Sequence, residues 1–150
     1  MGAEDFEALL RSHTELDDRQ LMVRAKHGLG GPSRAYESVY VNFINLPKGS
    51  GHGGGGAEAE NNRMSFWIHG FHGSDPHAPP PRGVVKVEMS NSALPRAYKL
   101  RAKTGSPAVV AKYLATFLNK VVQEVPPKFT HSHRETVTAD DILRGAGMKR

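Results

Sequence analysis

The sequence predicts an α+β fold, in which an antiparallel sheet of about four strands packs against one long helix in the second half of the chain. Two observations predict it. Several segments between residues 37 and 103 alternate apolar and polar side chains, as half-buried strands do. Residues 106–125 then carry apolar side chains at the spacing of one buried helical stripe. Direct connections between consecutive strands favour a meander, which leaves one sheet face for water, a partner or a ligand.

The chain length and composition fit a single domain over residues 1–150. We divide it into a helical N-terminal segment (1–34), a sheet-plus-helix core (37–125) and a tail with a short helix (126–150). The chain contains no cysteine, which excludes a disulfide framework, thiol catalysis and cysteine-ligated zinc.

The N-terminal segment predicts two short helices. Residues 4–12 suit the first. Thr14 and Asp17 have the spacing of a capping box, and they predict a second helix from about Glu15 to His27. Gly28 would end that helix.

Four strands follow. The alternating segments are Glu37–Leu46, Arg63–Phe71, Gly83–Ser90 and Ala97–Lys103. The glycine-rich stretch between the first two strands lacks the Gly-Lys-Ser/Thr ending of a phosphate-binding loop, so we interpret it as a flexible connection.

The long helix has clear end signals. Ser106 is a favourable N-cap, and Pro107 suits the first helical position because its missing N–H costs nothing there. The helix is predicted to run to about Val125, where Pro126 and Pro127 end it.

The formal net charge of +5 is unevenly distributed. Residues 1–81 hold 7 Lys+Arg against 10 Asp+Glu, a balance of −3, whereas residues 82–150 hold 13 against 5, a balance of +8. Such asymmetry indicates either an anionic partner or a domain whose acidic and basic halves offset each other. We expect no membrane partner, because no run of about 18 apolar residues occurs. The N-terminus is acidic where a signal peptide would be basic, so we expect an intracellular protein of the cytoplasm, nucleoid or nucleus, or one delivered without a cleaved signal.

A basic row is the main functional candidate. In Ala97–Lys103, Tyr98, Leu100 and Ala102 alternate with three cations. If the apolar side chains face the long helix, the cations face outward on the open sheet. The predicted nucleic-acid-binding residues are Lys86, Arg96, Lys99, Arg101 and Lys103, with Trp67 as a candidate stacking ring. Tyr40 is a second candidate ring for that face. For Trp67, burial in the core is the alternative, because a lone tryptophan is more commonly buried.

Other sites have simpler explanations. The free N–H groups at the start of the long helix could bind an anion, but a Ser-Pro cap explains the same residues. Five histidines could contribute to a zinc site together with Asp75. They are His69, His72, His77, His131 and His133. Solvated or hydrogen-bonded histidines are the usual alternative, and we expect no metal and no cofactor.

These observations favour a non-catalytic protein that binds nucleic acid, preferably single-stranded RNA or DNA, through a basic sheet face. An assembly subunit that forms a homo-oligomer or a protein complex is the first alternative. A histidine-dependent metal enzyme is the second.

Overall fold

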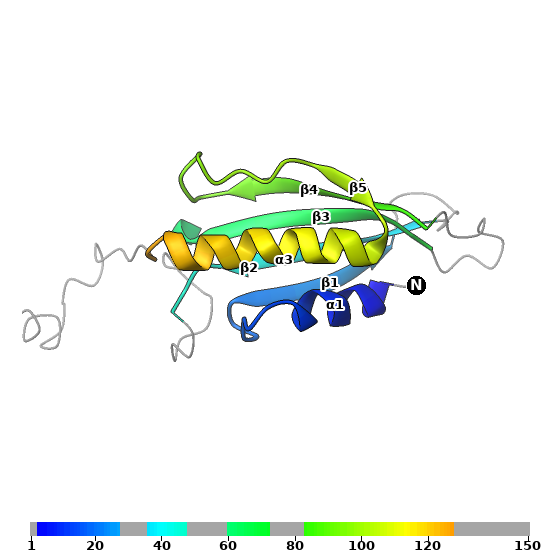
Figure 1. The fold of residues 1–150 in the computed structure, drawn as a ribbon, viewed down its shortest axis with the longest axis horizontal. Coiled ribbons are helices and arrows are strands. Elements are labelled where there is room, and N and C mark those ends of the chain that lie inside the picture. The colour runs from blue at the N-terminus through cyan, green and yellow to red at the C-terminus, as the bar shows by residue number, and fades with distance from the viewer. Residues whose placement is uncertain (1–2, 28–35, 48–59, 73–82, 128–150) are drawn as a thin grey trace, which may run out of the picture.

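The computed structural model describes residues 3–27, 36–47, 60–72 and 83–127. Its elements, in chain order, are α1 (Ala3–Ser12), β1 (Leu21–His27), β2 (Tyr36–Ile44), β3 (Arg63–His72), β4 (Val85–Ser92), β5 (Lys103–Gly105) and α3 (Pro107–Glu124). The five strands form one antiparallel sheet in the order β1-β2-β3-β4-β5 (Figure 1). The predicted α+β class is therefore confirmed, as is the long helix in the second half of the chain.

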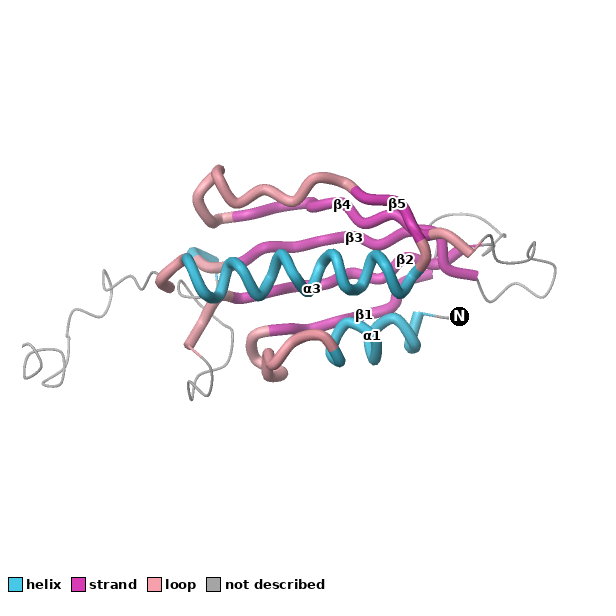
Figure 2. The backbone as a smooth tube through the Cα atoms, in the orientation of Figure 1, coloured by secondary structure: helices cyan, strands magenta, loops and turns pink. Residues whose placement is uncertain are grey.

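Both helices pack on the same face of the sheet, with α3 beside α1 (Figure 2). Phe6 of α1 and Leu114 of α3 are fully buried in one core. The fully buried strand side chains of this core are Leu21, Val39, Val41, Phe43, Met64, Phe66, Ile68 and Val87. Their alternation along the strands sends every second side chain to the opposite face. No described element covers that opposite face, which we call the open face.

The predicted helix from Glu15 to His27 is wrong, because residues 21–27 form strand β1. Each residue of this segment pairs with one of β2, from Leu21 opposite Phe43 to His27 opposite Glu37. Asp17 does not cap a helix. Its carboxylate accepts hydrogen bonds from the backbone N–H groups of Arg19 and Gln20, which form the turn into β1.

The predicted strand Ala97–Lys103 is also wrong for most of its length. Only Lys103–Gly105 pairs with β4, as β5. The segment before it runs beside α3 without joining the ladder. Two tyrosine hydroxyls bond there: Tyr98 donates to Glu124 Oε1 at 2.9 Å, and Tyr113 donates to the Arg101 carbonyl at 2.7 Å.

The predicted start of the long helix is confirmed. Ser106 is the N-cap of α3, and its Oγ accepts a hydrogen bond from the Val109 N–H at 3.2 Å. Pro107 occupies the first turn. The helical residues end at Glu124, with Val125 as the C-cap.

Several expectations fall on residues that the structure leaves undescribed. They concern residues 28–34 of the N-terminal segment, most of the glycine-rich stretch and the short helix of the tail. In the described parts of the chain, no helix has the length and apolar character needed to cross a membrane.

Candidate nucleic-acid interface

A row of four side chains crosses the open face. Arg24 of β1 lies opposite Tyr40 of β2, Tyr40 opposite Trp67 of β3, and Trp67 opposite Glu88 of β4. Directly opposed residues in a sheet project from the same face, so these four share the open face. Trp67 therefore lies on the open face. It is not buried in the core, which is the commoner position for a lone tryptophan. Its neighbour Phe66 faces the helices and is fully buried.

Three rings form a continuous aromatic surface on this face. The ring centroids of Tyr40 and Trp67 are 4.7 Å apart, with the planes tilted by 50°. The imidazole of His69 lies two residues along β3, stacked on Trp67 at 6.0 Å with an interplanar angle of 16°. All three side chains are partly exposed. The surface thus offers aromatic contact area to a planar ligand.

A hydrogen-bonded chain holds the imidazole in place. His69 Nδ1 is 2.9 Å from Ser38 Oγ, and His69 Nε2 is 2.9 Å from Glu88 Oε2. A carboxylate only accepts, so Nε2–H donates to Glu88 and, in the neutral ring, Nδ1 accepts from the Ser38 hydroxyl. The two bonds fix both the tautomer and the plane of the ring. Serine, imidazole and carboxylate also make up hydrolase triads, but neither of the two cavities described below contains these residues.

Two exposed cations flank the aromatic surface. Arg24 ends the row that contains Tyr40 and Trp67. Lys86 of β4 lies opposite His69 in the next row and opposite Thr104 of β5. The aromatic surface therefore has one positive side chain on each of its two sides. We call the set of Arg24, Tyr40, Trp67, His69 and Lys86 the open-face cluster.

The other predicted cations lie elsewhere, so the expected outward row on the open sheet is wrong. Lys103 pairs with Val87, whose side chain is buried under the helices, and its Nζ lies 5.6 Å from the Tyr113 ring centroid of α3. Lys99 and Arg101 border the same part of α3. Arg96 is exposed in the turn region after β4. Of the predicted site residues, only Trp67 and Lys86 come together on the open face.

Sequence reasoning missed two members of the open-face cluster. Arg24 was hidden by the incorrect helix, although the alternation of Leu21 and Val23 with Met22 and Arg24 suits a strand. His69 was considered as a metal ligand and not as a ring beside Trp67. Among the described residues, no group of three His, Asp or Glu side chains is arranged to hold a metal ion. The other four candidate histidines have no described side chain.

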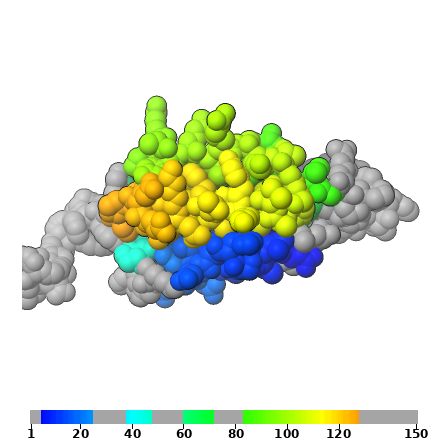
Figure 3. All heavy atoms as spheres, viewed as in Figure 1, coloured from blue at the N-terminus to red at the C-terminus, as the bar shows by residue number. Residues whose placement is uncertain are grey.

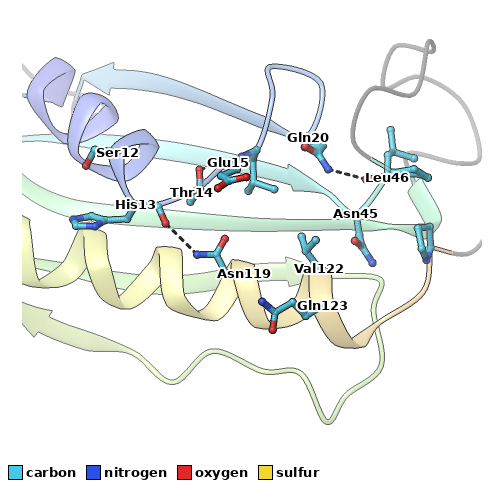
Figure 4. Close-up of a pocket in the computed structure, with 13 residues that line it drawn as sticks. Ser12, His13, Thr14, Glu15, Gln20, Asn45, Leu46, Asn119, Val122 and Gln123 are labelled. Carbon is cyan, nitrogen blue, oxygen red and sulfur yellow. Dashed lines mark hydrogen bonds between the residues drawn. The ribbon is translucent and has the colours of Figure 1, made fainter.

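A separate cavity of about 650 Å³ lies between the α1–β1 connection, the end of β2 and α3 (Figure 4). Three of its four amide side chains donate hydrogen bonds to backbone carbonyls. Gln20 Nε2 donates to the Leu46 carbonyl at 2.8 Å, and Asn119 Nδ2 donates to the His13 carbonyl at 3.1 Å. Asn45 Nδ2 donates to the Val125 carbonyl at 2.8 Å. These bonds tie the ends of the elements together, which is a structural role.

Comparisons with protein-family models, with curated proteins and with solved structures gave no significant match for this chain.

Proposed function

We propose that the protein binds single-stranded RNA or DNA through the open face of its sheet, without catalysis. The observation that supports this most is the aromatic surface of Tyr40, Trp67 and His69 with Arg24 and Lys86 on its two sides. Every base has a flat face that can stack on such rings, with a contribution of about 1–3 kcal/mol per base. The cations can contact the phosphates of the same strand.

A single strand suits this surface better than a duplex. The rings lie on a sheet face and do not project as a wedge, so they reach bases that are already unstacked. In a duplex the base faces are covered by their neighbours, and only phosphates would meet the protein. We expect weak sequence preference, because the described cluster offers stacking and charge in place of a set of groups that reads base edges.

The number of cations sets the expected salt dependence. Two phosphate contacts, from Arg24 and Lys86, predict a slope of log K against log salt of about −1.4 for a single strand. Between about 50 and 200 mM salt the affinity would then fall by roughly sevenfold. If the cations around Lys103 also contacted the strand, the slope would be several-fold steeper, so the slope distinguishes the two surfaces.

An anisotropy titration tests the proposal. The probe is a labelled oligonucleotide of about 12 dT or U residues, titrated at about 50 and 200 mM salt. Trp67→Ala should weaken binding by roughly 5- to 150-fold, and Lys86→Ala should reduce the slope by about 0.7. The matched control is Lys112→Ala, an exposed lysine of α3, which should change neither. Unchanged binding by Trp67→Ala, or equal competition by a duplex, would contradict the proposal.

The charges of the open face also favour a second candidate, in which two copies pack their open faces together. Arg24 and Glu88 stand at opposite ends of one row, with Tyr40 and Trp67 between them. A two-fold axis along the strands would set Arg24 of each copy against Glu88 of the other.

Sedimentation velocity separates this candidate from the first. A face-to-face dimer should be weakened by Glu88→Arg and restored when Arg24→Glu is added. A nucleic-acid interface should instead gain affinity from Glu88→Arg, because the change adds positive charge. A monomer at all concentrations would exclude the dimer.

A further inference from the structure

A groove runs between α3 and the segment that leads into β5. It has a volume of about 510 Å³, and we call it the α3 groove. Its lining residues are Lys99, Leu100, Arg101, Lys103, Val109, Lys112, Tyr113, Thr116, Phe117 and Lys120. Figure 3 shows the molecule from the helix side, where the segment before β5 borders α3. The open face lies on the other side of the sheet, so the groove and the open-face cluster are separate surfaces.

The rim of the groove is strongly positive. Five of the ten lining residues are Lys or Arg, all five are exposed, and none of the ten is Asp or Glu. The nearby acid Glu124 already accepts the Tyr98 hydroxyl. Five neighbouring cations of one sign repel one another, so a polyanion would relieve that repulsion as well as gain attraction.

The floor of the groove is apolar. Val109 is 49% exposed although it is a large hydrophobic residue, and Leu100 and Phe117 extend the same surface inward. The two aromatic rings of the groove, those of Tyr113 and Phe117, already contact other side chains and leave little free surface on which a base could stack. Lys103 lies over Tyr113, and Phe117 packs edge-on against Phe66 with their centroids 6.2 Å apart. The floor therefore suits aliphatic or aromatic side chains that insert from above, more than bases that need a free ring.

We infer that the α3 groove binds an acidic segment of a partner protein, in which large apolar side chains alternate with Asp and Glu. The apolar side chains would cover Val109, and the carboxylates would pair with the rim. A fatty acid has a single carboxylate and would pair with only one of the five rim cations. A nucleic acid could pair with the cations but would leave the apolar floor uncovered. This inference is independent of nucleic-acid binding, because it uses none of the open-face residues.

The experiment is a peptide selection followed by affinity measurement. A random display library of peptides about twelve residues long is selected on the full chain and counter-selected on Lys99→Glu/Lys112→Glu. The selected peptides should be rich in Asp and Glu and should contain Phe, Leu or Trp. Their binding should fall at least about tenfold on the charge-reversed variant and persist on Lys99→Arg/Lys112→Arg. Replacing their apolar side chains by Ser should weaken binding to a similar extent.

A second variant tests the floor without endangering the helix. Val109 is the third residue of α3, where a glutamate can complete a capping box with Ser106, so Val109→Glu should fold normally. It should abolish peptide binding. Trp67→Ala should retain it. The inference would be overturned if the selection gave no acidic peptides. It would also be overturned if the selected peptides still bound both groove variants. A third contradicting result is that the groove variants lose oligonucleotide binding but keep peptide binding. That result would assign the groove to the nucleic acid.

Discussion

The indole of Trp67 lies against the ring of Tyr40 across neighbouring strands, with their centroids 4.7 Å apart. Both rings lie on the sheet face away from α1 and α3. The next residue, Phe66, points to the opposite face and is fully buried. Two aromatic side chains that are adjacent in the sequence thus belong to different surfaces, one to the core and one to the open-face cluster.

This division predicts different costs for two alanine substitutions. Phe66→Ala should lower the free energy of unfolding by about 3–5 kcal/mol, because it leaves a cavity in the core. Trp67→Ala should lower it by about 0.5–1.5 kcal/mol, the value of an aromatic pair at a partly exposed site. Urea unfolding followed by circular dichroism measures both. Equal costs would show that Trp67 belongs to the core.

Removing the negative charge of Glu88, which lies beside the aromatic surface, should strengthen nucleic-acid binding. In Glu88→Gln the amide oxygen can still accept a hydrogen bond from His69 Nε2–H. The hydrogen-bonded chain of Ser38, His69 and residue 88 is therefore retained, while a negative charge is lost. We expect a gain of about 2- to 5-fold in oligonucleotide affinity at low salt. Glu124→Gln, an acid at the end of α3, is the matched control and should leave the affinity unchanged.

The cap of α3 should contribute measurably to stability. Ser106→Ala removes the acceptor for the Val109 N–H and should cost about 1 kcal/mol, whereas Ser106→Thr keeps an acceptor and should cost less. Thermal unfolding compares the two variants. The same melting temperature for Ser106→Ala and for the unchanged protein would contradict the assigned cap.

The hydroxyl of Tyr98 should titrate at a higher pH than that of an ordinary tyrosine. The hydrogen bond to Glu124 raises the pKa of Tyr98 above its usual 10.0, with smaller contributions from burial and from the negative charge of Glu124. Because the folded-state pKa is the higher one, the associated stability is fully present below pH 10 and is lost as the pH rises through the folded value. Glu124→Ala should lower the pKa of Tyr98 toward 10, and Glu88→Ala should not. Ring resonances in a pH series measure both.

The fold was predictable where one pattern dominated. Strands β2, β3 and β4 alternate over their length, and α3 has both an apolar stripe and the Ser106–Pro107 start. Strand β1 was not predictable because Leu21, Met22 and Ala25 fit helical spacing, while Leu21, Val23 and Ala25 fit the alternation of a strand. Only its pairing with β2, which begins after eight intervening residues, decides between the two.

The candidate site was only partly predictable, for a related reason. The alternation in Ala97–Lys103 correctly separates the cations from Leu100, but Lys99 and Arg101 lie outside the ladder, and the face of Lys103 depends on its register with β4. Lys103 falls opposite Val87 and so turns toward α3, whereas Lys86 falls opposite Thr104 on the open face. A shift of one residue would exchange the two faces. Register is set by tertiary pairing, which no local pattern encodes here.

The most direct test of nucleic-acid binding uses the single tryptophan of the chain, Trp67, as its own reporter. Its fluorescence is followed while an unlabelled single strand of about 12 nucleotides is added at about 50 mM salt. A base stacked on the indole should quench the emission in a saturable way, with partial reversal at about 200 mM salt, and a duplex should quench much less. An emission that stays unchanged while anisotropy shows the oligonucleotide to be bound would place the strand elsewhere, and it would contradict the open-face interface.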